Sequence, residues 1–213
     1  HAAQLAEAGS DAIELNVYET VTDVGERSED VERRLVELVQ EVRNQVGVPL
    51  AVKLSPWFTS LGHLAASLAG VGVNGLVLFN RFYQPDIDLD TLDVTPALSL
   101  SAPPEARLSL HWIGALRGVV PVSLAASSGV HSGTDALKLL LAGADVVMTT
   151  SALLRHGPAH LATMLADIEA WMVEREYDSV RQLQGSVSRA NVPDPGAYDR
   201  RNYYQVIHSW AAR

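Results

Sequence analysis

The feature that most constrains the fold is a local pattern that occurs five times along the chain. In each case a helical stretch ends at a glycine, and a short turn leads into an apolar run rich in β-branched residues; the glycines are Gly9, Gly47, Gly72, Gly118 and Gly143. Glycine suits a helix end because left-handed backbone costs it no Cβ clash. The runs that follow are 12–17, 50–54, 76–79, 122–126 and 146–149. Short, nearly continuous apolar runs are typical of strands buried on both faces, so the pattern predicts a parallel sheet covered by helices.

Between these runs the apolar residues recur with the period of a helix. From Val31 to Val46 they share one face, with Ser28 as the predicted N-cap and Glu29 suiting the positive end of the helix dipole. Further helices are predicted at 61–69, 135–142 and 160–176, the second of them capped at Ser132 or Thr134. Helices that alternate with strands call for right-handed crossovers between parallel neighbours.

We therefore predict an α/β fold, and within it the last five βα units of a TIM (β/α)8 barrel. A complete barrel takes about 250 residues, whereas this chain of 213 residues opens in mid-helix and has five strands. A doubly wound open sheet is the alternative; the barrel is favoured because no Gly-x-Gly-x-x-Gly follows a strand and polar residues follow all five. With bare strand edges, we expect such a polypeptide to be unstable in isolation.

The predicted organisation is a barrel portion with a tail. Residues 1–176 form the C-terminal part of the barrel, with a lid-like insertion at about 82–104. The alternation of Ile87 and Leu89 in that insertion suggests a small β element. Residues 177–213, rich in Arg, Pro and aromatics, form a tail that packs on the barrel.

Composition narrows the class of function. The formal charge of -9 argues against a nucleic-acid or anionic-membrane surface and favours a small-molecule substrate, while a homodimer stays open. No cysteine is present, so the chain has no disulfide or thiolate site, and the cytoplasm is the expected compartment. We predict no metal site, because the histidines lack ligand spacing and the Asp86, Asp88, Asp90 run lacks the central Gly and terminal Glu of a calcium loop.

Lys53 is the most informative candidate residue, because it lies at the end of a strand that is otherwise apolar. A buried ammonium group needs a partner. It can face an anionic cofactor, form a Schiff base after a lowering of its pKa, or simply pair with a neighbouring carboxylate such as Glu14. The strand-end position favours a functional role.

The last two strands end in small hydroxyl-bearing residues. Ser127-Ser128-Gly129 and Thr149-Thr150-Ser151 each precede a predicted helix. Small residues let backbone N–H groups approach an anion, and barrels commonly bind phosphate after strands seven and eight. The alternative is that these residues only form turns and caps.

Two amides and an arginine complete the strand-end set. Asn16 and Asn80 can hydrogen-bond a planar heterocycle through donor and acceptor, or can be satisfied by adjacent backbone. Arg81 begins the longest insertion and is the predicted clamp for a substrate anion.

These residues resemble the dihydroorotate dehydrogenase superfamily, and more closely its bacterial dihydroorotate dehydrogenase-like proteins. The matching segments are DAIELN (11–16), VKLSP (52–56), GLVLFNRFYQPDIDL (75–89), SGV (128–130) and AGADVVMTTSAL (142–153). The resemblance implies a TIM barrel that carries FMN at the strand ends, with roughly the first third of the barrel absent. It implies that Asn16 and Asn80 contact the flavin side, that Lys53 lies near N1 of the ring, and that Gly129, Thr150 and Ser151 hold the phosphate beside Ser128. A fixed ammonium near N1 stabilises the negative charge of a reduced flavin.

One segment departs from the family pattern. Family members follow the first Asn with Ser-Cys-Pro-Asn or Ser-Ser-Pro-Asn, whereas here Asn16 leads into Val-Tyr-Glu-Thr-Val. Glu19 occupies the position of the base, and Val21 replaces the second Asn. Ser128 and Thr150 also stand where the family has glycine.

The resulting prediction is an FMN-dependent oxidoreductase of the CH–CH class. A small anionic substrate other than dihydroorotate passes a hydride to the flavin while Glu19 or Tyr18 manages the proton. Two rival hypotheses stay open: a flavin-free lyase or aldolase in which Lys53 forms a Schiff base, and a noncatalytic barrel that serves as a binding module.

Overall fold

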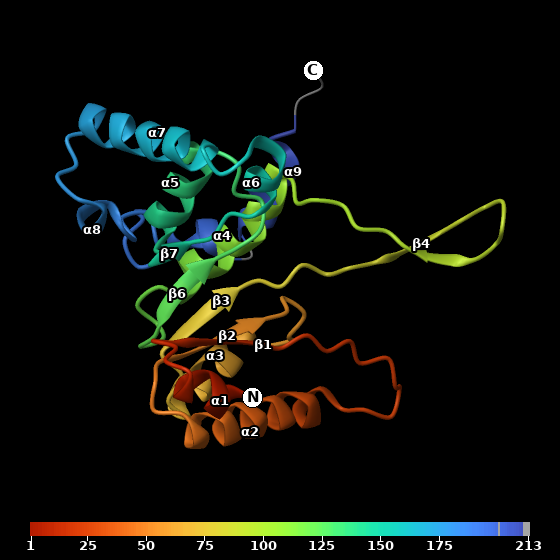
Figure 1. Cartoon of the computed structure of the whole chain (residues 1–213). Coiled ribbons are helices and arrows are strands. Elements are labelled where there is room, and N and C mark those ends of the chain that lie inside the picture. The colour runs from red at the N-terminus through yellow and green to blue at the C-terminus, as the bar shows by residue number, and fades with distance from the viewer. Residues whose placement is uncertain (200, 211–213) are drawn as a thin grey trace.

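The computed structural model describes residues 1–199 and 201–210, with the backbone alone for 201 and 202. Helices and strands alternate along it (Figure 1). In chain order the elements are α1 (Ala2–Glu7), β1 (Ile13–Asn16), α2 (Ser28–Gln45), β2 (Leu50–Leu54), α3 (Leu61–Gly70), β3 (Gly75–Leu78), β4 (Pro85–Ile87), β5 (Val94–Pro96), η1 (Pro103–Glu105), α4 (Ala106–Leu116), β6 (Ser123–Ala126), α5 (Gly133–Ala142), β7 (Val146–Val147), α6 (Ser151–His156), α7 (His160–Glu174), α8 (Val180–Leu183), η2 (Pro195–Tyr198) and α9 (Arg201–His208).

Five strands form one parallel sheet in the order β1-β2-β3-β6-β7. Each strand pairs with the next one in the sequence, apart from the small hairpin β4–β5 that intervenes. A doubly wound sheet would reverse its strand order part-way, and this sheet does not. The fold is therefore α/β and consists of five consecutive βα units of the TIM-barrel type, as predicted.

The predicted glycine signals explain most of the helix-to-strand turns. Gly9, Gly72, Gly118 and Gly143 all have positive φ. Gly47 is the exception: α2 ends at Gln45, and the next residue, Val46, has an extended φ of -128°, so the prediction of a left-handed turn at Gly47 was wrong. The backbone leaves this helix by straightening, which needs no glycine.

The two predicted helix caps differ in outcome. Ser132 caps α5: its hydroxyl accepts from the N–H of Asp135, whose carboxylate accepts in return from the Ser132 N–H, a capping box. Ser28 was predicted as the N-cap of α2, but it is the first helical residue and Arg27 takes the cap position. The correction moves the boundary by one residue, as is common at helix ends.

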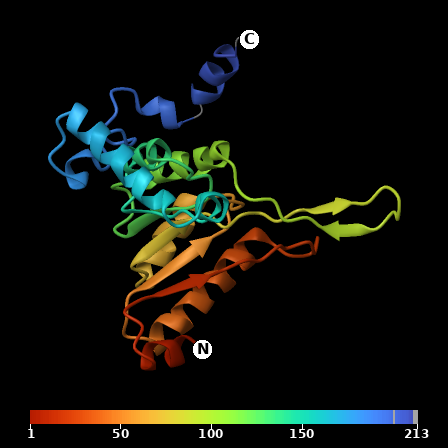
Figure 2. The same cartoon turned by 45° about the horizontal axis from the view of Figure 1, so that its top comes forward.

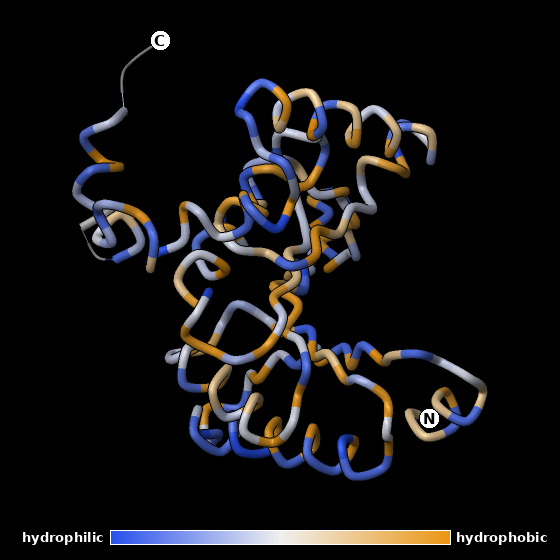
Figure 3. The backbone as a smooth tube through the Cα atoms, turned by 90° about the vertical axis from the view of Figure 1, so that its left-hand side faces the viewer, coloured by the Kyte–Doolittle hydropathy of each residue, from blue (hydrophilic) through white to orange (hydrophobic). Residues whose placement is uncertain are grey.

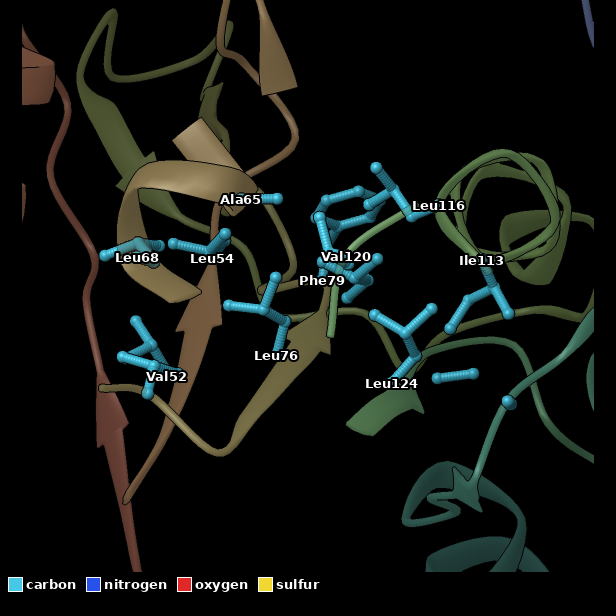
Figure 4. Close-up of a cluster of buried hydrophobic side chains, with 14 of the residues drawn as sticks. Val52, Leu54, Ala65, Leu68, Leu76, Phe79, Ile113, Leu116, Val120 and Leu124 are labelled. Atoms are coloured by element: carbon cyan, nitrogen blue, oxygen red, sulfur yellow. The ribbon is translucent and has the colours of Figure 1, made fainter. Parts of the chain in front are cut away.

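The hydrophobic core lies between the sheet and the helices on its outer, convex face. Val52, Leu54 and Leu76 point toward Leu68 of α3, and Leu124 points toward α4 (Figure 4). Each of these side chains is at most 1% exposed, and burying one leucine stabilises the fold by about 1.5–3 kcal/mol. In Figure 3 the strands in the middle of the molecule are largely orange, whereas α2 at the bottom alternates blue and orange.

Side chains on the other face of the strands are less buried. In β2, Ala51 and Lys53 are partly exposed where their neighbours are fully buried. This alternation follows from the period of two along a strand. It places Lys53 on the concave side, away from the core.

The insertion after β3 contains an antiparallel hairpin that projects from the body. Strands β4 and β5 pair over three residues each, and Figures 1 and 2 show the hairpin extending on the side toward which the C-terminal ends of the sheet strands point. Its large apolar side chains, Ile87 and Leu89 among them, are exposed. The hairpin therefore lies beside the strand ends without covering them.

The segment after α7 contacts the helical layer at several points. Leu183 of α8 is fully buried against Leu137 and Leu140 of α5, and the ring of Tyr198 lies against Gly114 of α4. Helix α9 extends beyond the body (Figure 2). Within the described part of the chain, every helix is too short or too polar to cross a membrane.

Candidate active site

The C-terminal ends of the sheet strands surround a cavity of about 520 Å³, here called the inner cavity. Its volume lies within the range of about 300–1,000 Å³ that is usual for small-molecule sites. Parallel strands bring their C-terminal ends to one edge, which explains why residues so far apart in sequence meet there. The predicted site residues that line it are Asn16, Tyr18, Lys53, Asn80, Arg81, Ser128, Gly129, Thr150 and Ser151.

Lys53 lies in the floor of this cavity and pairs with Glu14. The Lys53 Nζ is 3.6 Å from Glu14 Oε1, and 21% of the lysine side chain is exposed. The register of β1 and β2 places Asn16 directly beside Lys53. The sequence left two roles open for Lys53, pairing with Glu14 and facing an anionic cofactor. The structure shows the Glu14 pair and the cavity position together, so the ammonium stays available to an anion.

The two asparagines have different surroundings. Asn80 Nδ2 donates to the carbonyl oxygen of Val17 at 2.8 Å and, more weakly, to that of Lys53 at 3.4 Å, so this amide joins the ends of β1 and β2. The Asn16 side chain makes no hydrogen bond to any described residue. The first amide is thus partly committed to the scaffold, whereas the second offers its donor and acceptor to a ligand.

The turn after β6 is tight and depends on its glycine. Ser128 and Gly129 have φ values of 75° and 72°. A Cβ on Gly129 would lie against the backbone nitrogen of Ala106 and 2.8 Å from the carbonyl oxygen of Ala102. Ser128, where the family has glycine, keeps the left-handed backbone at a cost of about 1 kcal/mol. The turn thereby presents small groups to the cavity.

The segment after β7 uses its hydroxyls mainly within the protein. Thr149 Oγ1 donates to the carbonyl oxygen of Val130 at 2.8 Å. Ser151 Oγ lies 2.8 Å from Ser101 Oγ and accepts from the Ser101 N–H at 3.1 Å. Ser101 is a site residue that sequence reasoning missed. It lies 50 positions from Ser151, so no local motif points to it.

Arg81 crosses from the end of β3 to the segment before α4. Its Nε is 3.1 Å from Glu105 Oε2, and its Nη1 donates to the carbonyl oxygen of Ser99. The guanidinium also lies over the ring of Tyr83, whose N–H donates to the hydroxyl of Tyr18. Arg81 is therefore a fixed cation at the cavity edge.

Glu19 does not reach the inner cavity. It lines a second cavity of about 420 Å³, here called the outer cavity, between α2 and the loop after β2, and its carboxylate pairs with Arg34 at 3.2 Å. The chain leaves the inner cavity between these two residues: Tyr18 lines the inner cavity, whereas Glu19 and Thr20 line the outer one. Hydrogen bonds to Glu26 and Glu19 raise the pKa of Arg34, so the arginine is a permanent partner.

Residues of the inner cavity fit FMN. Lys53 and Arg81 supply positive charge, Asn16 supplies an amide, and Gly129 allows the tight turn that brings backbone to the cavity, because a Cβ there would collide with the backbone of Ala102 and Ala106. Among the described residues, no group of three or more His, Cys, Asp or Glu could hold a metal ion.

The sequence profile described as dihydroorotate dehydrogenase matches residues 2–172. The chain belongs to the dihydroorotate dehydrogenase family. FMN is the cofactor of this family. The match spans all five sheet strands and all residues that line the inner and outer cavities, as the sequence motifs predicted.

Several curated relatives support this membership. Dihydroorotate dehydrogenase A (fumarate) of Limosilactobacillus reuteri is 34% identical over 170 residues, which is 76% of this chain and 54% of that protein. The catalytic subunits of dihydroorotate dehydrogenase B (NAD(+)) from Desulforudis audaxviator and Methanothermobacter thermautotrophicus are 29% and 27% identical, over 71% and 86% of this chain and 50% and 63% of theirs. The chain thus spans about half to two thirds of the length of these relatives.

Proposed function

We propose that this protein is an FMN-dependent oxidoreductase that oxidises a CH–CH bond of a small anionic substrate. The observation that carries the proposal is the convergence of Lys53, Asn16, Gly129 and Ser151 on one cavity at the strand ends. When bound there, FMN supplies the hydride acceptor for the reaction. A chain of this family with this set of groups has the parts that such a cofactor requires.

Lys53 supports the proposal through its charge. An ammonium fixed at the floor of a partly closed cavity stabilises negative charge that develops near it, and it does so without reorganisation of solvent. Among the described residues, the one acid paired with it is Glu14, at 3.6 Å. Lys53 can therefore hold the ring of the cofactor and raise its reduction potential.

Tyr18 is the better candidate of the two predicted proton acceptors. Its side chain lines the inner cavity and its hydroxyl is held by the Tyr83 N–H at 3.2 Å, whereas Glu19 lines the outer cavity and pairs with Arg34. A base must come within hydrogen-bond reach of the proton that it removes. We propose that Tyr18 acts as its phenolate: the phenolate oxygen, which accepts the Tyr83 N–H, takes the proton lost when the substrate is oxidised and becomes the neutral phenol.

Arg81 is the proposed anion clamp. Its guanidinium is a planar donor suited to a carboxylate, and it already holds the carboxylate of Glu105 at the cavity edge. A substrate carboxylate can take the place of Glu105 or share the remaining donors. The lid-like role of residues 82–104 belongs to the same proposal, since Arg81 adjoins that insertion.

Dihydroorotate is the substrate to test first, because the relatives above are named dihydroorotate dehydrogenases. The departures at Glu19 and Val21 predicted a different substrate, and the relatives give that prediction no support. The test is anaerobic reduction of the FMN-loaded protein, followed by loss of the visible flavin band. Dihydroorotate should bleach the flavin faster than dihydrouracil, which lacks the carboxylate. If neither compound bleaches it while dithionite does, dihydroorotate is excluded.

A further inference from the structure

Ser101 lines the inner cavity, as do Gly129 and Ser151. It belongs to the segment between the β4–β5 hairpin and α4 and is only 4% exposed. Its backbone N–H and its hydroxyl both point to one atom, Ser151 Oγ, at 3.1 and 2.8 Å. A buried serine that directs both its N–H and its hydroxyl to the hydroxyl of one other residue is unusual and calls for an explanation.

The hydroxyl of Ser151 has two lone pairs and one proton. With both lone pairs taken by Ser101, the proton of Ser151 is left to donate elsewhere. Ser151 makes no other side-chain hydrogen bond to a described residue, and it lines the cavity. Its hydroxyl is therefore held as a donor toward whatever occupies the cavity, and only an acceptor satisfies it.

Ser101 is itself fixed from behind. Its carbonyl oxygen lies 2.7 Å from His131 Nε2. The backbone of His131 is anchored in turn, because its N–H donates to Asp135 Oδ2 and its carbonyl oxygen lies 2.8 Å from His160 Nε2. This chain of contacts leaves Ser101 little freedom, and its burial leaves little room for water to replace its hydroxyl.

We propose that Ser101, held by His131, is a positioning residue that fixes Ser151 as a hydrogen-bond donor to the phosphate of FMN. The proposal rests on the proposed function. A phosphate offers oxygen acceptors, whereas the terminal hydroxyl of riboflavin can satisfy the donor only as a single neutral acceptor. Ser101 thereby gives the site a preference for FMN over riboflavin. Lys53 and Asn16, proposed to hold the flavin ring, do not contribute to this preference because both flavins carry the same ring.

The test is the ratio of the riboflavin and FMN dissociation constants, measured by flavin fluorescence titration of the full-length protein. The wild type should bind FMN more tightly. Ser101→Ala should weaken FMN by about tenfold or more, the usual effect of one hydrogen bond to a charged group, and leave riboflavin within about twofold. Ser101→Thr, which keeps the hydroxyl, should restore the ratio, and His131→Leu should lower it in the same direction.

Two further variants separate positioning from folding. Ser188→Ala is the matched control, because Ser188 is fully buried, outside the cavity, and its Oγ has no partner in the described structure; it should leave the ratio unchanged. In the Ser151→Ala background, Ser101→Ala should add nothing to the loss.

The outcomes distinguish this inference from the proposed function. If Ser101→Ala weakens the binding of FMN and riboflavin equally, or if the effects of Ser101→Ala and Ser151→Ala are additive, the positioning role is overturned. The proposal that the protein binds FMN is not affected by either result. A wild-type protein that binds neither flavin overturns both. If Ser101→Ala fails to fold, the ratio measured for His131→Leu decides: an unchanged ratio contradicts the proposal.

Discussion

The inner and outer cavities meet at the ends of β1 and β2 and differ in charge. Asn16 and Lys53 face the inner cavity, while their neighbours Val17 and Leu54 face the outer one. The inner cavity holds two cations among amides and hydroxyls. The outer cavity is lined by aromatic and aliphatic side chains together with four carboxylates, those of Glu19, Asp23, Glu26 and Glu32.

The difference shows that the alternation of side chains along a strand places different chemical groups on the walls of the two cavities, just as it separates core from surface. Moving one residue along an extended segment carries a side chain to the other face. Tyr18 and Glu19 are adjacent in the sequence, yet only the first can act on a ligand beside Lys53. An anion is therefore stabilised on one side of these strand ends and repelled on the other, and each prediction below tests one consequence.

The largest expected effect is that of Gly129→Ala. A methyl group there collides with backbone of Ala102 and Ala106 and needs a left-handed φ. We expect a loss of about 2–4 kcal/mol in the free energy of unfolding and no FMN uptake. Urea denaturation and flavin titration measure both. The control is Gly62→Ala, at a helical site with nothing near the added Cβ, which should be neutral or stabilising. Normal FMN binding by Gly129→Ala would contradict the role given to the turn after β6.

Tyr18→Phe should act on chemistry rather than on binding. Removal of the proton acceptor should slow flavin reduction by dihydroorotate about 100-fold or more, with the FMN dissociation constant unchanged within about twofold. Stopped-flow absorbance measures the rate. Glu19→Gln, on the outer side, should leave the rate within about twofold. The reverse ranking of these two variants would return the base to Glu19.

Lys53→Met should weaken FMN by about tenfold or more, since it removes a charge that faces the cofactor. The matched change on the outer side is again Glu19→Gln, which should leave FMN affinity unaltered. Equilibrium titration of each variant decides the comparison. Equal affinities for wild type and Lys53→Met would mean that the lysine serves only Glu14.

Arg81→Leu should remove the preference for a carboxylate, reducing the ratio of dihydroorotate to dihydrouracil reduction rates by about tenfold. Arg34→Leu, a cation lost from the outer side, should leave that ratio alone. Anaerobic reduction with each compound gives the comparison. An unchanged ratio in Arg81→Leu would confine Arg81 to its contacts with Glu105 and Ser99.

Much of the fold could be predicted because its signals are local. The glycine turns at Gly72 and Gly143, the Ser132 cap and the apolar strand runs each involve residues close in sequence. Strand ends in a parallel sheet converge by geometry, so Lys53 and Gly129 could be placed together without knowledge of side-chain contacts.

Other parts of the site could not be predicted because they depend on distant contacts. Ser101 meets Ser151 across 50 positions, within an insertion whose path no periodicity fixes. The side of the strand that Glu19 faces depends on how far the extended backbone continues past Asn16, and the sequence alone leaves that open. A shift of one residue decides whether a side chain faces the inner or the outer cavity. The predicted end of a strand is uncertain by one or two residues, so the sequence does not decide which of Tyr18 and Glu19 faces the cofactor.

The most direct test of the account is a visible absorption spectrum of the purified full-length protein, with release and identification of any bound chromophore and a titration with added FMN. We predict a yellow protein that releases FMN, or a colourless one that takes up one equivalent and shows the flavin band. A colourless protein that takes up no FMN would contradict the assignment of the inner cavity to a flavin.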